Sequence, residues 1–266
     1  MYCMNKRVAI VGYGYVGKAF ERYFKDHFQV IWFDPFLEGS ADEEEINACD
    51  LAIVCVPTNM SPDGSCDTSI VRDVMKWLNT PLILIKSAIE PGTVDSLNHD
   101  NVCVSPEYVG EGNYFVQFWK YPHPTDVKLH DFFVIGGKEP TRAKIVDFFL
   151  AVSGPSLKII KMSALEAEIV KYTENAWGAM KVTFANEIFE ICKALGADYQ
   201  TVREGWVADG RVERMHTMVI EGKRGYKSKC FDKDIPAFIK TAETVGYDAK
   251  ILKQVVDSNE DFKAKN

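Results

Sequence analysis

The fold is decided by residues 7–25, RVAIVGYGYVGKAFERYFK. The apolar run Arg7–Val11 has the length and composition of a buried strand, and the residues that follow the glycines have the spacing of a helix. Gly12, Gly14 and Gly17 form a G-x-G-x-x-G turn between the two. Such a turn lets the backbone approach a pyrophosphate, whose charge is met by free N–H groups at the helix start. The stretch therefore predicts a strand, a turn and a helix that bind a dinucleotide.

A second apolar run, Phe28–Phe33, ends at Asp34, twenty positions after Gly14. A carboxylate at this point accepts hydrogen bonds from the adenosine ribose hydroxyls of a dinucleotide. The same carboxylate repels a ribose 2′-phosphate, so the cofactor is predicted to be NAD and not NADP. A simpler interpretation, in which Asp34-Pro35 is only a turn and the glycines only join a strand to a helix, stays open here.

Strand-like runs alternate with helical patterns through the first half of the chain. The runs are Leu51–Val56, Leu82–Ile85, Val102–Val104 and Phe132–Ile135, and the helical patterns include Ile70–Leu78 and Thr141–Leu150. This alternation predicts an α/β fold with a Rossmann-like, doubly wound parallel sheet and helices on both faces. Ligands of such sheets bind beyond the carboxyl ends of the strands, which directs attention to the residues after each run.

Two glutamates follow the run Val102–Val104. If this segment is helical, Glu107 and Glu111 share a face and could supply a base or orient a water molecule. Two solvated glutamates at a helix start are the alternative. The next segment, Asn113–Asp131, is predicted to be a long surface loop in which His130 is solvated.

A helical pattern without proline runs from Ser163 to about Leu195. Ser163 and Glu166 have the spacing of a capping box, and at 1.5 Å per residue the helix would be roughly 50 Å long. We predict two domains: an NAD-binding, Rossmann-like domain at 1–160 and a helical dimerisation domain at 161–266 that is built on this helix.

The same helix is too apolar to be covered by one side of a small domain. This excess of apolar surface predicts a homodimer. Lys171 and Asn175 are four residues apart on it, so their side chains point to the same side.

The 266 residues carry a formal net charge of -7, with 47% hydrophobic and 26% charged residues. That balance is typical of a globular protein and argues against general binding to nucleic acid or to an acidic membrane. No apolar run is long enough to span a bilayer and the start has no signal-peptide core, so a cytoplasmic protein is expected. The seven cysteines include no Cys-x-x-Cys pair, which predicts neither disulfides nor a metal site.

Residues 224–234, RGYKSKCFDKD, place one cysteine among lysines. The nucleophile in cysteine chemistry is the thiolate, and the cations of Lys227, Lys229 and Lys233 favour this form. Cys230 is therefore a candidate nucleophile, although a lone cysteine among lysines is more often inert.

Several separated motifs occur in a fixed order along the chain. They are Gly12–Gly17, Val56-Pro57-Thr58, Lys86-Ser87, Ser105-Pro106-Glu107 with Glu111-Gly112, Glu168–Tyr172 with Asn175, Phe184–Glu187 and Cys230–Asp234. Together they resemble the UDP-glucose/GDP-mannose dehydrogenase family, from about Arg7 to about Val255. The resemblance implies that an NAD-dependent enzyme oxidises the primary alcohol of a nucleotide sugar to a carboxylate, as in UDP-glucose to UDP-glucuronate, and uses two NAD molecules.

The resemblance also implies catalytic roles for individual residues. Cys230 would attack the intermediate aldehyde and carry a thioester. Lys171 would stabilise the developing oxyanion, Asn175 would donate a hydrogen bond to the same oxygen, and Asp234 would help to place water. Glu107 matches the family's candidate for proton transfer or thioester hydrolysis.

The ligand-binding residues follow from the same resemblance. The cofactor-binding residues are predicted to be Gly12, Gly14, Tyr15, Val16, Gly17, Asp34, Pro57, Thr58, Ser87 and Glu111. The substrate-binding residues are predicted to be Glu107, Lys171, Asn175, Arg211 and Tyr226. Of these, Arg211 would reach a sugar nucleotide that is bound by the neighbouring subunit.

Three departures from the family pattern are visible. Ala88 replaces a threonine after Lys86-Ser87, Lys227 and Ser228 replace two glycines before Cys230, and the chain stops where a third, nucleotide-binding domain would begin. The substrate could then be a nucleotide sugar or a smaller sugar-like alcohol, and a second chain could complete the site. Two other functions stay open: a non-catalytic NAD-binding homologue that acts as a sensor or assembly partner, and a two-electron β-hydroxyacid-type dehydrogenase.

Overall fold

A computed structural model describes residues 6–109 and 126–266. The chain forms two compact units: the first takes Met1–Asn59 and Asp67–Lys171, and the second takes Met60–Cys66 and Tyr172–Asn266. The domain division predicted from the sequence, 1–160 and 161–266, stays a prediction.

The first unit is organised around one seven-stranded sheet with the order β2-β1-β3-β4-β5-β6-β7. Its strands are β1 (Arg7–Val11), β2 (Gln29–Phe33), β3 (Leu51–Val54), β4 (Leu82–Ile85), β5 (Val102–Val104), β6 (Phe132–Gly137) and β7 (Lys158–Met162). Neighbouring strands are parallel except β5 and β6, which are antiparallel. The predicted Rossmann-like α/β fold is confirmed, with one antiparallel pair in a sheet that was expected to be wholly parallel.

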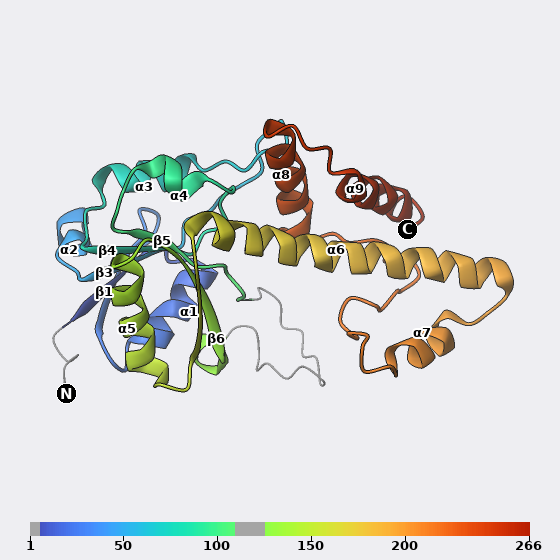
Figure 1. Cartoon of the computed structure of the whole chain (residues 1–266), viewed down its shortest axis with the longest axis horizontal. Helices are drawn as coiled ribbons and strands as arrows, with labels where there is room; N and C mark the ends of the chain where they lie inside the picture. The colour runs from blue at the N-terminus through green and yellow to red at the C-terminus, as the bar shows by residue number, and fades with distance from the viewer. Residues whose placement is uncertain (1–5, 110–125) are drawn as a thin grey trace. The chain divides into compact units, whose positions relative to one another are not determined.

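Helices cover both faces of this sheet (Figure 1). One face packs against α1 (Tyr15–Phe24) and α5 (Thr141–Ser153), whose buried aromatic rings include Tyr23 and Phe149. The other face packs against α2 (Glu43–Asn47), α3 (Ser69–Trp77) and α4 (Thr93–Leu97). The central strands are apolar on both sides for this reason, since each side chain of β3 and β4 meets a helical layer.

Three short elements of this unit were missed by sequence reasoning: β7, α2 and α4. Each has five residues, which is too short for periodicity to separate a strand or a helical turn from a loop. The strand β7 reads KIIKM and pairs with β6 along its whole length.

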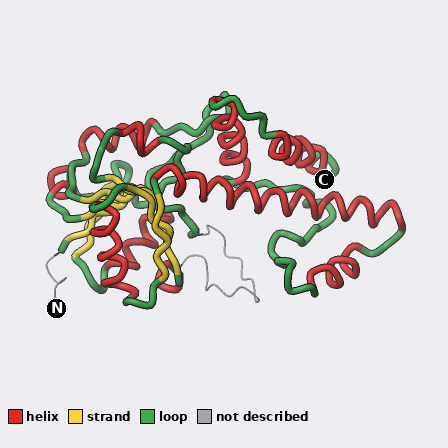
Figure 2. The backbone as a smooth tube through the Cα atoms, in the orientation of Figure 1, coloured by secondary structure: helices red, strands yellow, loops and turns green. Residues whose placement is uncertain are grey.

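The second unit is built on α6 (Ala164–Leu195), which begins in the first unit and continues as one uninterrupted helix of 32 residues (Figure 2). The other helices of this unit are α7 (Tyr199–Val207), α8 (Phe231–Thr244) and α9 (Lys250–Lys263). The predicted capping box is confirmed, because Glu166 accepts from the Ser163 N–H at 2.7 Å and its own N–H donates to Ser163 Oγ at 3.2 Å. Across residues 6–109 and 126–266, no helix has both the length and the apolar character to cross a membrane.

Candidate functional site

The glycine turn after β1 is fixed by contacts inside the protein and open on its outer side. A Cβ on Gly12, whose φ is +90°, would lie 2.7 Å from the Cys55 carbonyl oxygen, and one on Gly17 would lie 2.2 Å from the Gly12 carbonyl oxygen. A Cβ on Gly14 would meet no described atom within 4 Å. Packing therefore requires the first and third glycines, whereas the second leaves a free approach to the first turn of α1. This open cradle is the shape that a pyrophosphate needs.

Asp34 is held at the end of β2 beside this turn. Its Oδ2 accepts a hydrogen bond from the Tyr13 N–H at 3.0 Å, and its Oδ1 accepts one from the Phe36 N–H at 3.1 Å. The Tyr13 ring stacks on Trp32, with 4.2 Å between ring centroids. These contacts fix the direction of a half-buried carboxylate whose remaining lone pairs can accept from ribose hydroxyls.

The other predicted cofactor residues of the sheet lie at the ends of β3 and β4. Thr58 Oγ1 donates to the Ala88 carbonyl oxygen at 2.7 Å, and Ser87 Oγ donates to the Val56 carbonyl oxygen at 2.7 Å. These two hydroxyls tie the ends of neighbouring strands together. Pro57 beside them is exposed, as is Tyr15 at the start of α1.

Glu107 lies in an irregular segment, so the helical arrangement considered for it does not exist: residues 105–109 are described and are not helical. Glu111 lies outside the described residues. Glu107 Oε1 accepts from the Val109 N–H, and its Oε2 lies 3.5 Å from Lys86 Nζ. With Lys171 it lines a cavity of about 10 Å³, room for about one water molecule. The first unit thus brings Glu107 and Lys171 to one small cavity.

Two titratable groups near the sheet differ from expectation. Glu168, on α6, was not singled out, yet it is 2% exposed and accepts from the Gly92 N–H at 2.6 Å and the Val94 N–H at 2.9 Å. Burial raises its pKa to about 7. His130 was expected to be solvated and is instead half-buried near Phe133, where burial lowers its pKa.

Cys230 in the second unit is the residue from which α8 starts. It occupies the N-cap position, and the Asp234 N–H donates to its carbonyl oxygen at 2.8 Å. The Cys230 residue is exposed, whereas the other cysteines among the described residues are buried or half-buried, and all are free thiols. The N–H groups at a helix start favour a thiolate. The structure therefore presents an exposed cysteine at the start of a helix.

Ser228 has a specific use in this arrangement. Its Oγ accepts from the Phe231 N–H at 2.9 Å, and its own N–H donates to Asp232 Oδ2 at 2.8 Å. A glycine at this position could not supply the hydroxyl, so this departure from the family pattern adds a cap to α8.

Asn175 and Asp234 are paired in the core of the second unit. Asn175 Nδ2 donates to Asp234 Oδ2 at 2.5 Å, and the two residues are 6% and 1% exposed. Lys233 Nζ also contacts Asp234, at Oδ1. The carboxylate predicted to place water is therefore held from two sides.

Tyr226 and Arg211 have different surroundings. Tyr226 is buried in a cluster with Ile235 and Val255, and its main chain exchanges two hydrogen bonds with the side-chain amide of Asn259, at 2.7 and 3.2 Å. Arg211 is exposed and pairs with Asp209. Their roles as substrate-binding residues stay predictions.

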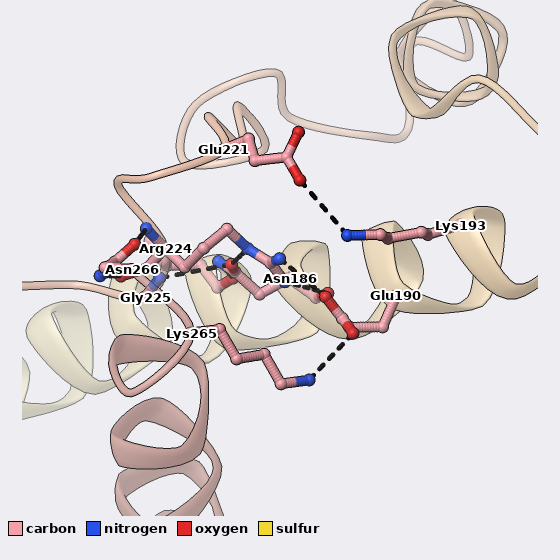
Figure 3. A network of polar contacts seen from close by, with 9 residues as sticks. Asn186, Glu190, Lys193, Glu221, Arg224, Gly225, Lys265 and Asn266 are labelled. Carbon is pink, nitrogen blue, oxygen red and sulfur yellow. Dashed lines mark hydrogen bonds and ion pairs between the residues drawn. The ribbon is translucent and has the colours of Figure 1, made fainter.

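Arg224 anchors the start of the segment that leads to Cys230 (Figure 3). Its Nε donates to Asn186 Oδ1 at 2.6 Å and its Nη1 to Glu190 Oε1 at 2.7 Å, both on α6. The Asn266 side-chain amide accepts from the Arg224 N–H and donates to its carbonyl oxygen at 3.2 Å. The guanidinium is 4.2 Å from the centroid of the Phe189 ring. These contacts fix where the segment leaves the core.

Comparison with known families identifies both halves of the chain. Residues 20–148 match the UDP-glucose/GDP-mannose dehydrogenase family, NAD binding domain, and residues 165–261 match the central domain of the same family. The chain belongs to the UDP-glucose/GDP-mannose dehydrogenase family.

Individual members of this family are similar over most of the chain. A UDP-glucose 6-dehydrogenase of Pseudomonas aeruginosa is 30% identical over 245 residues, which are 84% of this chain and 49% of that protein. The UDP-glucose 6-dehydrogenase AglM of Haloferax volcanii is 28% identical and covers 84% of this chain and 55% of that protein. The chain thus spans about half the length of these curated relatives.

Solved structures show the same fold. A UDP-glucose dehydrogenase from Pyrobaculum islandicum superposes with a TM-score of 0.82 at 25% identity, over 97% of this chain and 69% of that one. A 3-hydroxyisobutyrate dehydrogenase from Mycobacterium tuberculosis has a TM-score of 0.69 at 17% identity, over 98% of this chain and 94% of that one, and shares the fold alone.

NAD is the cofactor of this family's first domain, and the residues of this chain fit it. The open cradle at Gly14 suits a pyrophosphate, and the oriented carboxylate of Asp34 suits an unphosphorylated ribose. Ala88 contributes its carbonyl oxygen to Thr58, so the loss of a hydroxyl at position 88 leaves the join between the strand ends intact. No cluster of three or more potential metal ligands occurs in the described part of the chain.

Proposed function

We propose that the chain acts as an NAD-dependent nucleotide-sugar 6-dehydrogenase that oxidises a primary alcohol to a carboxylate through a thioester on Cys230. The observation that carries this proposal is the exposed Cys230 at the N-cap of α8, one helical turn before Asp234, whose carboxylate is paired with Asn175 of α6. Neither a binding module nor a two-electron dehydrogenase needs an accessible thiol at a helix start. From the substrates that name the family, we expect the substrate to be a nucleotide sugar of the UDP-glucose type.

The chemistry requires two oxidations at one carbon. NAD, when bound, accepts the hydride ion lost in each oxidation. The alcohol first becomes an aldehyde, and the Cys230 thiolate adds to its carbonyl carbon to form a thiohemiacetal. Loss of the second hydride leaves a thioester, and water then adds to the thioester carbonyl while the carbon–sulfur bond breaks. The products are a carboxylate and the regenerated thiol.

The described residues can support these steps from each unit. Lys171 supplies a fixed positive charge for the oxyanion that develops during addition. Glu107, beside the small cavity that it lines with Lys171, can accept the proton of the attacking water. Asp234 has its orientation fixed by Asn175 before substrate arrives, which reduces the reorganisation needed during reaction.

A homodimer is part of this proposal. Several large apolar side chains of α6 are exposed in the single chain: Trp177 by 52%, Phe184 by 48%, Ile191 by 47% and Leu195 by 78%. An apolar stripe of this kind favours a second copy as its cover. We expect the protein to work in the cytoplasm.

The test is an assay of the purified protein against a panel of nucleotide sugars, in which NADH and acid are both measured. The proposal expects two NADH per acid formed, and none with the Cys230→Ala variant. Cys192→Ser, which alters a buried thiol, is the matched control and should keep full activity. One NADH per product would favour a two-electron dehydrogenase of the β-hydroxyacid type. NAD binding without turnover on any nucleotide sugar would favour a non-catalytic homologue.

A further inference from the structure

Lys86 is a buried cation that the proposed mechanism does not use. It follows β4 directly and is 2% exposed. Its Nζ donates to the Pro106 carbonyl oxygen at 2.6 Å and to Ser105 Oγ at 3.2 Å, and it lies 4.9 Å from the centroid of the Phe20 ring. The ammonium group is therefore enclosed by the segment that follows β5 and by α1.

The carboxylate nearest to this ammonium belongs to Glu107. Glu107 Oε2 lies 3.5 Å from Lys86 Nζ, is itself buried, and has no hydrogen-bond partner among the described residues. Its other oxygen accepts from the Val109 N–H. A buried carboxylate without a compensating partner favours its neutral form, and an ammonium within 4 Å opposes that tendency. The Val109 N–H fixes Oε1 of Glu107, and the positive charge of Lys86 stabilises a negative charge on Oε2.

The surroundings contain few other charges that could replace Lys86. Burial lowers the pKa of His130 and raises the pKa of the Cys55 thiol. Cys55 and His130 are thereby favoured in their neutral forms. Burial also lowers the pKa of Lys86, but there the Glu107 carboxylate opposes the effect and favours the charged ammonium. Lys171 is the second cation close enough to act on Lys86, and it lies above the ring of Tyr108, 5.6 Å from the centroid.

We propose that Lys86 is a positioning residue for thioester hydrolysis: its ammonium group keeps the Glu107 carboxylate ionised and fixed beside the small cavity that it lines with Lys171. This inference rests on the proposed function, in which Glu107 acts as the base. During hydrolysis the proton of the attacking water passes to Glu107 as the oxygen bonds to the thioester carbon and the sulfur leaves. Lys86 gives and takes no proton in this step.

The decisive variant is Lys86→Met, which keeps the length of the side chain and removes the charge. The carbon-13 signal of labelled glutamate follows proton uptake by Glu107, and the Glu107→Gln variant identifies which signal belongs to this residue. In Lys86→Met, proton uptake by Glu107 should move to higher pH by about one unit or more. The acid limb of the rate of acid formation should move in the same direction. Lys86→Gln, which keeps a hydrogen-bond donor, serves where Lys86→Met does not fold.

The two measurements separate this inference from the proposed function. An unchanged carbon-13 titration in a folded Lys86 variant overturns the inference whatever the activity. A shifted titration with an unmoved acid limb also overturns it, because Lys86 would then act on Glu107 without effect on hydrolysis. A shifted titration in a protein that forms no acid from any nucleotide sugar supports the electrostatic role of Lys86 and refutes the proposed function.

Discussion

Asn175 on α6 and Asp234 on α8 are 59 positions apart in sequence and are joined by a buried hydrogen bond of 2.5 Å. The bond anchors the first turn of α8, where Asp234 lies, to α6. Cys230 is four residues earlier, one helical turn, so this bond and the apolar packing of Phe231 and Ile235 together hold the start of the helix that carries the thiol. Two residues expected to act separately on substrate are therefore also partners in positioning the nucleophile.

Asn175→Asp should lower the free energy of unfolding by about 3 kcal/mol, because it brings a second carboxylate to Asp234 in a buried site. The double variant Asn175→Asp, Asp234→Asn restores one amide and one carboxylate and should recover most of this loss. Denaturation by urea measures both. If the double variant is no more stable than Asn175→Asp alone, the hydrogen bond does not hold the two helices as described.

Asp34→Ala should weaken NAD binding by about 1.5–3 kcal/mol, the contribution of hydrogen bonds to a charged group. It should also reduce the preference for NAD over NADP, since the carboxylate that repels a 2′-phosphate is gone. Titration followed by the fluorescence of Trp32, which stacks on Tyr13 beside Asp34, reports both affinities. Asp26→Ala, which removes an exposed carboxylate paired with Lys128, is the control. Equal affinity of the unaltered protein for the two cofactors would refute the role of Asp34.

Glu168 should make stability fall as pH rises. Burial raises its folded pKa to about 7 from 4.5, so between these values the folded state holds a proton that the unfolded state has released. The stabilisation is complete below pH 4.5 and is lost as pH passes 7, by about 3 kcal/mol in all. Relative to Glu168→Gln, the unaltered protein should lose this amount between pH 4 and pH 8. Urea denaturation at several pH values gives the difference, and parallel curves would contradict the assignment.

Arg224→Met should cost about 3–5 kcal/mol of stability, because it leaves partners of a buried ion pair without their cation. The Arg224 and Glu190 side chains are 3% and 33% exposed. Lys193→Ala is the matched control: its pair with Glu221 appears in the same network in Figure 3, but the two side chains are 65% and 76% exposed. Surface pairs contribute about 1 kcal/mol or less. Similar losses for the two variants would show that burial does not set the strength of these contacts.

The sequence predicted the elements whose signal is local. The glycine turn with Asp34, the four central strands and the helix that begins after Ser163 all depend on spacing within one segment, and each was found where it was expected. The start of α8 at Phe231 was not expected, because residues 224–234 contain no apolar periodicity before Ile235. The Phe231 N–H at this helix start donates to the Ser228 hydroxyl, and Ser228 was noted in the sequence only because it replaces a glycine of the family pattern.

Contacts between distant segments could not be predicted from spacing. Nothing local pairs Arg224 with Asn186, or places Glu168 at the N–H groups of α4. Lys86 was quoted only as part of a motif, although its polar side chain at the end of an apolar strand was a usable signal. A lysine that directly follows four buried residues of a central strand is a candidate for burial, and a buried lysine needs a partner inside the protein.

Cys230 should be the first of the described thiols to react with iodoacetamide, by a factor of about ten or more, because it is exposed at a helix start where a thiolate is stabilised. Burial raises the pKa of Cys103 to about 12 and also raises that of Cys49. Peptide mass spectrometry after brief labelling identifies the thiol, and Cys192→Ser should leave the pattern unchanged.

Saturating NAD or substrate should alter the rate at which Cys230 reacts with iodoacetamide, since both would bind near it in the proposed mechanism. Replacement by Ala should abolish acid formation and leave NAD affinity unchanged, because the sulfur acts on the substrate carbon. If Cys230 does not react and its Ala variant keeps full activity on an identified substrate, the thioester mechanism is wrong and a two-electron dehydrogenase replaces it.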